Sequence, residues 1–466
     1  MILAAVAATL LWQPARLSPT RATTETMLAA YRRDVVPFRE RVSRLHVVEG
    51  PDAFDAIALQ RGSDYRIDLT LGGAAYAFGR DEGVRWRRTP AGTVRVIASD
   101  VQGDALDRWP SAVFGFDQNA CAPDGETRDG NDLRWVLACR AAGDAPHWFF
   151  IDAASGAIVR EVAREGVHVV TYTFDANGWT VDGFGGKATV TSVPDGARAV
   201  AERDVAIPAS RGDVFALPDG AATPVRAFFG PDDVAVPVTI DGQPSEFVLD
   251  TGTTQILIDP RVAARAHLRT TLGHAIVRRL AIGALTGHDV PVQVVDLFGG
   301  AMGGILGNEF FTGHIVHLDY AKRRLELLDR ASFVPPPGAP AMAVDFGEGM
   351  PLVEAQVNAT DGERFALDTG STEVLLNAPF AHIAGVDGRS ALTVEQFLEG
   401  PIDVTHGSAD ALRFGPVAFE HLRVGAVRPS ASNLDIPLDG IIGTDELRYF
   451  EWWFDYDGGR LWLRRT

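Results

Sequence analysis

The sequence predicts a mostly β protein in which a β-rich (α+β) N-terminal domain precedes two similar β lobes. Three observations lead to this prediction. The N-terminal part alternates short apolar strands with Gly/Asp turns. The C-terminal part contains two copies of one series of motifs. Three consecutive prolines separate the copies, and such a run continues neither a helix nor a central strand.

The bulk composition sets the class of protein. The 466 residues are more than one hydrophobic core usually organises, so we expect two to four domains. Contents of 46% apolar and 22% charged residues are ordinary for a globular protein. The formal net charge of −18 disfavours nucleic acid and anionic membrane surfaces as partners.

The N-terminal leader (residues 1–22) begins with an apolar run. Up to Trp12 its only polar side chain is that of Thr9. The run is much shorter than the roughly 20 residues of a membrane span and is typical of a secretory signal, with cleavage after Ala15 or Ala22. No positive residue precedes the run, which a misassigned start or a membrane-proximal leader would explain. A disordered or packed N-terminal stretch is the other alternative. We expect an exported, periplasmic protein without a membrane span.

The predicted N-terminal domain (residues 23–190) starts with helical spacing up to Gly50 and continues as a β-meander. It resembles the curved-sheet domains of periplasmic lipoprotein carriers. From this we expect a mostly β domain with a helix. Its role is open, and an inhibitory segment or a partner-docking domain are two options.

The two cysteines, Cys121 and Cys139, flank a Gly/Asp-rich turn and a strand. Two cysteines alone cannot supply the four ligands of a structural zinc site. In an oxidising compartment they would close the hairpin as a disulfide. Two unpaired buried thiols are the alternative.

A connector (residues 191–224) is predicted to lead into lobe 1 (225–333) and lobe 2 (334–466). Each lobe opens with a strand and an Asp-Gly turn and continues into an apolar strand that ends in Asp-Thr-Gly. Each later contains an apolar pair followed by Gly, and each closes with a strand that ends in Asp-Tyr. Four landmarks in the same order imply a duplicated lobe.

The Asp-Thr-Gly triplets occur in "FVLDTGTTQILID" and "FALDTGSTEVLLN". A carboxylate in an apolar strand is costly to bury. A single triplet is most simply a strand-ending turn, because Asp and Gly are common turn residues. Two triplets with matching neighbours argue for a shared chemical role instead.

With these motifs, the stretch from Phe228 to Thr466 resembles the retropepsin-like aspartic peptidases. The resemblance implies two small β lobes that face each other across a cleft. Both lobes lie on one chain, so the protein resembles a fused pseudo-dimer that needs no oligomer for catalysis. The family implies a peptide or protein substrate, and neither a cofactor nor a metal.

The resemblance also assigns roles to single residues. Asp250 and Asp368 would be the catalytic pair. Two carboxyls held together cannot both ionise cheaply, so they share a proton, and the aspartic-protease pair is the standard example of this effect. The supporting residues would be Thr251 and Thr369, which bond across the lobe interface; Gly252 and Gly370, which let backbone approach the carboxylates; Thr253 and Ser371, which donate hydroxyl bonds to the outer oxygens; and Gly307 and Gly443, which pack under the Asp loops.

The lobes also differ. From Asp250 to Gly283 there are 33 residues, and from Asp368 to the matching Gly415 there are 47. We expect the extra length, around 390–402, to form a flap hairpin over the substrate that lobe 1 has lost; an ordinary surface insertion is the alternative.

A second difference is that lobe 1 has Gly303 where lobe 2 has Asp439. The Asp is common at this position in the family, so its absence affects the expected geometry of lobe 1.

The sequence therefore predicts an aspartic endopeptidase in which the Asp250/Asp368 pair activates a water molecule. The alternative is a non-catalytic peptide-binding or regulatory module on the same fold. His314 and His317 lie close together in "GHIVHLDY", and we expect structural roles for them, because no metal-ligand spacing is visible.

Overall fold

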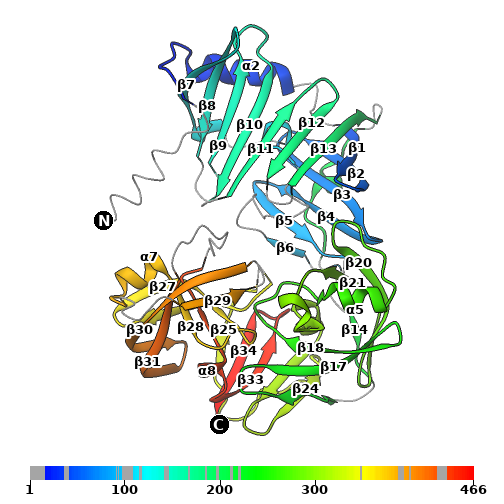
Figure 1. Ribbon diagram of the computed structural model, residues 1–466, viewed down its shortest axis with the longest axis vertical. Coiled ribbons are helices and arrows are strands. Elements are labelled where there is room, and N and C mark those ends of the chain that lie inside the picture. Colours follow the sequence, from blue (N-terminus) through cyan, green and yellow to red (C-terminus); the bar gives the residue numbers. More distant parts are fainter. Residues whose placement is uncertain are drawn as a thin grey trace. The chain divides into compact units, whose positions relative to one another are not determined.

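The structure is a computed structural model (Figure 1). None of the helices in its described part has the length and apolar character that a bilayer span requires. The structure describes residues 16–35, 41–90, 92, 94–96, 109–114, 118–140, 146–165, 168–183, 186–195, 199–209, 214–218, 222–346, 349–386, 393–397, 400–427 and 438–466. Most of the predicted leader and part of the predicted flap lie outside these ranges.

The described chain divides into two compact units. The N-terminal unit runs as far as Ala209, and the C-terminal unit runs from Ser210 to Thr466 and includes the short segments 71–74 and 88–95. Strand β13 reaches Pro194, and β14 and β15 already belong to the lobes. The segment 191–224 therefore contains several regular elements and is less of a plain connector than the sequence predicted.

The N-terminal unit is built on one antiparallel sheet of thirteen strands, ordered β6-β5-β4-β3-β2-β1-β13-β12-β11-β10-β9-β8-β7. Two meanders make up the sheet, and the pairing of β1 with β13 joins them. Strands with alternating burial, such as β1 and β2, leave one face for the core. The elements are α2 (Thr24–Val35), β1 (Arg41–Glu49), β2 (Asp52–Arg61), β3 (Asp64–Leu71), β4 (Ala74–Asp81), β5 (Val84–Arg88), β6 (Val94–Val96), α3 (Ser111–Phe114), η2 (Gln118–Ala120), β7 (Cys121–Asp129), β8 (Asp132–Cys139), β9 (His147–Asp152), β10 (Ile158–Glu165), β11 (His168–Phe174), β12 (Gly178–Gly183), β13 (Gly186–Pro194) and α4 (Glu202–Val205).

Helix α2 covers one end of this sheet. Its Met27 and Tyr31 are buried in a core with Phe149 of β9. Cys121 and Cys139 face each other at the open ends of the β7–β8 hairpin and form a disulfide.

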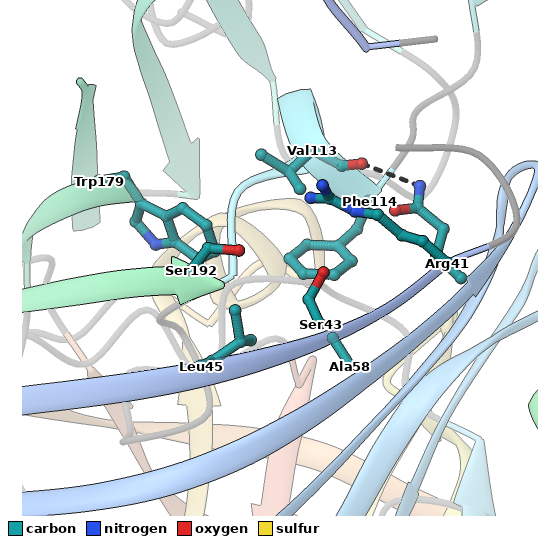
Figure 2. Close-up of a pocket in the computed structure, with 9 residues that line it drawn as sticks. Arg41, Ser43, Leu45, Ala58, Val113, Phe114, Trp179 and Ser192 are labelled. Carbon is teal, nitrogen blue, oxygen red and sulfur yellow. Dashed lines mark hydrogen bonds between the residues drawn. The ribbon is translucent and has the colours of Figure 1, made fainter. Parts of the chain in front are cut away.

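A hollow lies between β1, α3 and β12 in the same unit. Figure 2 shows Arg41, Val113 and Trp179 at its wall. The Gln60 side chain fixes α3 by donating to the Val113 carbonyl oxygen over 2.9 Å. An adjoining pocket of about 440 Å³ has mostly apolar walls, and burial lowers the pKa of Arg41 to about 10.

Each lobe of the C-terminal unit is a closed barrel of six strands. In lobe 1 the circuit is β17-β18-β22-β19-β21-β20, and in lobe 2 it is β26-β27-β32-β28-β31-β30. The fold class is thus confirmed. The elements of lobe 1 and its approach are β14 (Phe215–Ala216), β15 (Ala222–Val225), β16 (Phe228–Phe229), β17 (Val234–Ile240), β18 (Gln243–Leu249), β19 (Leu257–Ile258), α5 (Pro260–Arg265), β20 (His274–Ile282), β21 (Leu285–Val294), η3 (Phe298–Gly300), β22 (Gly304–Leu306), α6 (Asn308–Phe311), β23 (Ile315–Asp319) and β24 (Arg324–Leu328).

Lobe 2 repeats this order and adds one strand, β29. Its elements are β25 (Ala341–Ala343), β26 (Leu352–Val357), β27 (Thr360–Leu367), β28 (Val374–Asn377), α7 (Ala378–Ile383), β29 (Thr393–Phe397), β30 (Gly400–Phe414), β31 (Val417–Val427), β32 (Gly440–Ile442), α8 (Thr444–Leu447), β33 (Phe450–Asp455) and β34 (Arg460–Arg465).

A six-stranded sheet, β15-β24-β23-β33-β34-β25, joins the lobes. Its central pair is β23 of lobe 1 and β33 of lobe 2, which run antiparallel. One face carries apolar side chains such as Leu318 and Trp452 into the common core. The lobes are therefore joined by both main-chain hydrogen bonds and a continuous core.

Candidate active site

Asp250 and Asp368 stand directly after β18 and β27. Each strand pairs in parallel with a short apolar strand of its own lobe: β18 with β22, which precedes Gly307, and β27 with β32, which precedes Gly443. The Asp250 N–H donates to Leu306 O over 3.1 Å, and the Asp368 N–H donates to Ile442 O over 3.0 Å. The apolar strands thus fix the backbone from which each carboxyl projects.

Thr251 and Thr369 link the two loops reciprocally. The Thr251 N–H donates to Thr369 Oγ1 over 3.1 Å, and the Thr369 N–H donates to Thr251 Oγ1 over 3.0 Å. The Thr251 hydroxyl donates to Leu367 O over 2.7 Å, and the Thr369 hydroxyl to Leu249 O over 2.9 Å. Both side chains are buried, so these four bonds fix the position of one loop relative to the other.

The glycines of the triplets bring the carboxyls together. A Cβ built on Gly252 would lie 2.6 Å from Asp368 Cγ, and one built on Gly370 would lie 2.4 Å from Asp250 Cγ. No real Cβ atom tolerates such distances, so each loop backbone contacts the other lobe's carboxyl. Two acidic side chains that are 118 positions apart in sequence therefore meet.

The two carboxyls have different surroundings. Asp250 accepts from the Gly252 N–H over 2.7 Å and from the Thr253 hydroxyl over 2.6 Å. Asp368 accepts from the Gly370 N–H over 2.8 Å. The predicted bond from the Ser371 hydroxyl is wrong: that hydroxyl lies 3.5 Å from Glu373 O instead. Serine lacks the β-branch that restricts χ1 of threonine, so its hydroxyl can turn away.

Burial raises the pKa of Asp368 well above its ordinary value, and the charge of Asp250 and a hydrogen bond with the Asp250 carboxyl raise it further. The Gly370 and Ser371 N–H groups oppose this shift. The raised pKa favours the protonated form of Asp368, whereas Asp250 accepts hydrogen bonds from one N–H group and one hydroxyl. The arrangement suits an acid and a base acting together, although the pair titrates as a unit.

Gly307 and Gly443 lie beneath the Asp loops. A Cβ at Gly307 would come within 2.2 Å of Gln255 O, and one at Gly443 within 2.6 Å of the Thr372 carbonyl carbon. The Thr444 N–H then donates to Ser371 O over 2.8 Å. Any side chain at either glycine would push the loop that carries the carboxyl.

A comparison with known protein families agrees with the position of this site. Residues 236–310 and 353–445 match the family model described as aspartyl protease. The two matched segments contain both Asp-Thr-Gly loops and both apolar strands beneath them. Both lobes are thus similar to the aspartyl protease model over these two segments.

Two solved structures are similar to the chain. The aspartic proteinase from Irpex lacteus shares 15% identity over 53% of this chain and 98% of its own, with a TM-score of 0.34. The retropepsin-like aspartic protease from Rickettsia conorii shares 19% identity over 28% of this chain and 100% of its own, with a TM-score of 0.22. No curated protein matches the chain. Family and fold support a peptidase-like function.

The contacts at Asp439 and Gly303 explain why the two lobes have different residues at this position. The Asp439 carboxyl accepts from the Glu363 and Arg364 N–H groups over 2.8 and 3.1 Å. At Gly303 a Cβ would lie 2.4 Å from Ser245 Oγ. Lobe 1 has therefore filled with Ser245 the space that a side chain at this position needs.

A hairpin exists in the segment predicted as a flap. Strand β29 pairs with the start of β30, with Thr393 opposite Val404 and Phe397 opposite Gly400. The corresponding segment of lobe 1, from α5 to β20, contains no such hairpin in the described residues. At the base of the hairpin, His406 Nε2 lies 2.7 Å from the Glu373 carboxylate, which belongs to the Asp368 loop.

Sequence reasoning missed Glu373, His406 and Glu446. Glu446 follows Gly443 by three positions, and its Oε2 is buried without a hydrogen-bond partner among the described residues. Burial, and then the charge of Asp445, raises its pKa to about 7. A Glu in the short helix after the apolar-apolar-Gly motif was the available signal, but its burial could not be foreseen.

Proposed function

We propose that the C-terminal unit is an aspartic endopeptidase in which Asp250 and Asp368 activate one water molecule. The observation that carries this proposal is the contact between the two carboxyls, each set against the glycine of the opposite lobe. A pair of this kind supplies a base for water and an acid for the leaving group without a metal or a covalent intermediate.

In the proposed reaction the Asp250 carboxylate takes a proton from water while the water oxygen attacks the scissile carbonyl carbon. Asp368 then gives its proton to the departing amine nitrogen, so that the C–N bond breaks and a carboxylic acid and an amine result. The donors at Asp250 and the raised pKa of Asp368 support this division of charge. The substrate would lie extended beneath the β29–β30 hairpin and bond through its main chain.

The test compares Asp250→Asn and Asp368→Asn with Asp289→Asn, at an exposed position of β21 in lobe 1 that serves as the isosteric control. Either dyad variant should lower the cleavage rate of a denatured protein by at least ~10³-fold, because one side chain then lacks its proton-transfer function. The control should cleave normally. Undiminished turnover in either dyad variant would end the proposal.

The alternative is a module that holds peptides without cutting them. Both carboxyls and the Thr251–Thr369 linkage are present, which favours catalysis. A pepstatin-type transition-state mimic separates the two: a peptidase should bind it and lose activity, whereas a binding module should hold a labelled peptide that stays intact during long incubation.

Export to the periplasm is proposed as well. The disulfide between Cys121 and Cys139 suits an oxidising compartment. Ser18 forms two main-chain hydrogen bonds with Glu126, each 2.8 Å long, so cleavage after Ala15 would keep this contact and cleavage after Ala22 would remove it. N-terminal sequencing of the protein from the periplasmic fraction decides between the two sites; recovery only from the cytoplasm contradicts export.

A further inference from the structure

His317 lies in the middle of the sheet that joins the lobes, and both of its ring nitrogens face carboxylates. Nδ1 lies 2.9 Å from Glu326 Oε2, and Nε2 lies 2.9 Å from Glu451 Oε1. Glu326 is the neighbour on β24 in lobe 1, and Glu451 is on β33 in lobe 2. A single imidazole therefore connects acidic groups of both lobes.

Two of the three side chains are shielded from water, and the third, Glu326, is 20% exposed. The His317 side chain is 4% exposed and that of Glu451 is 2% exposed. The imidazole stacks on the Trp453 indole, with 4.7 Å between ring centres and 6° between planes. The surrounding apolar cluster includes Trp462 and Phe333 of the link between the lobes. Solvent cannot easily replace a lost hydrogen bond between His317 and Glu451, because both side chains are buried.

A neutral imidazole has one N–H and one lone pair. It can donate to one of the two carboxylates, but its other nitrogen would then face a second acceptor at 2.9 Å. Two acceptors at that distance repel each other. A neutral imidazole between two carboxylates therefore has one proton too few for this geometry. One additional proton must be held by Glu326, His317 or Glu451.

The other charged groups around the triad are already paired with one another, with Glu451 or with Glu326, whose Oε2 lies 3.6 Å from Arg324 Nε. Lys322 donates to Asp319 over 2.9 Å, and Arg324 donates to Glu451 over 3.4 Å. Arg464 of β34 donates through Nε to the second Glu451 oxygen over 3.0 Å. A metal ion could in principle contact His317, Asp319 and Glu451, because one ligand atom of each lies within 4.8 Å of the other two. Protein donors already bind these carboxylates, however, so the site suits a proton better than a metal ion.

We propose that the Glu326–His317–Glu451 triad holds this additional proton and acts as a pH-dependent link between the two lobes. As the pH rises, the triad gives one proton to solvent, His317 keeps a single N–H, and its contact with either Glu326 or Glu451 becomes repulsive. The stabilisation is present at low pH and is lost as the pH passes through the transition of the folded triad. The inference does not depend on peptidase activity.

The direct test is the protonation state of the His317 ring in the full chain. Two-bond ¹H–¹⁵N spectra, assigned with His317→Asn, should show both ring nitrogens protonated at pH 5 to 6. They should show loss of one proton at higher pH, together with a fall in Tm of about 2–4 °C. A single protonated nitrogen at every pH at which the protein is folded would overturn the proposal.

Glu326→Gln provides a matched variant, because its amide can donate to Nδ1 while the neutral ring donates from Nε2 to Glu451. This variant should keep one ring N–H throughout and lose the pH-dependent fall in Tm. Glu354→Gln, an exposed position on β26, should behave like the wild type. Unchanged pH dependence in Glu326→Gln would count against the triad, and the wild-type spectra decide the matter even if this variant does not fold.

Discussion

Gly370 lies against the carboxyl of Asp250, so closely that a Cβ at this position would be 2.4 Å from Asp250 Cγ. The glycine belongs to lobe 2 and the carboxyl to lobe 1. Gly252 has the corresponding relation to Asp368 at 2.6 Å. The approach of the two carboxyls therefore depends on the absence of two side chains as much as on the acids themselves.

Gly370→Ala should abolish proteolysis, with a loss of at least ~10²-fold, because the added methyl group must push the Asp250 carboxyl away from Asp368. The cleavage rate measures the effect, and circular dichroism checks that the β structure is retained. A folded variant with more than a third of wild-type activity would show that the carboxyls need not lie as close as described.

Thr253 and Ser371 occupy matching positions but make different contacts. Thr253→Val removes the 2.6 Å bond to Asp250 while keeping the shape of the side chain. It should lower the rate by about 10- to 150-fold, since a charge-assisted bond is worth roughly 1.5–3 kcal/mol. Ser371→Ala should change the rate less than threefold, because its hydroxyl contacts Glu373 O. Equal losses in the two variants would contradict the asymmetry.

Glu446 should make stability depend on pH. Its pKa is raised to about 7 in the folded protein from an ordinary 4.5, mainly by burial, so the folded state favours the protonated form. Stability is full below pH 4.5 and falls as the pH rises towards 7. Glu446→Gln should therefore raise the Tm by about 2–4 °C at pH 8 and leave it unchanged at pH 4. Glu420→Gln, on the exposed side of β31, is the control; a gain at pH 4 alone would refute the interpretation.

The β29–β30 hairpin should be needed for proteolysis but not for folding. Replacing residues 390–402 by a short Gly-Ser linker should abolish peptide cleavage, because the hairpin would no longer cover the substrate. The pepstatin-type mimic should bind more weakly, and the thermal transition of the lobes should persist. Full retained activity would identify the hairpin as an ordinary surface insertion.

The sequence was informative where chemistry demands fixed residue types in a short stretch. Asp250 and Asp368 stand in local motifs, and the duplicated order of landmarks was enough to predict two β lobes. Glu373 and His406 are 33 positions apart and meet only through the barrel of lobe 2, so no local pattern revealed them. The direction of the Ser371 hydroxyl depends on a rotamer, which residue type alone does not determine.

The N-terminal unit shows the same limit on a larger scale. Hairpins such as that closed by Cys121 and Cys139 follow from turn residues between short strands. The pairing of β1 with β13 joins strands separated by more than a hundred positions, so its register depends on how both meanders bury their apolar faces. Strand content was therefore predictable, but the single thirteen-stranded sheet was not.

The central position of β33 in the shared sheet has a consequence for biosynthesis. Lobe 1 offers β23 as a partner, but the strand that pairs with it begins only at Phe450. A nascent chain that has not yet reached Phe450 contains both Asp-Thr-Gly loops but lacks the β23–β33 pair that joins the two lobes. Any hydrolytic power would then arise only after β33 has been made, which would spare the chain from cutting itself before that point.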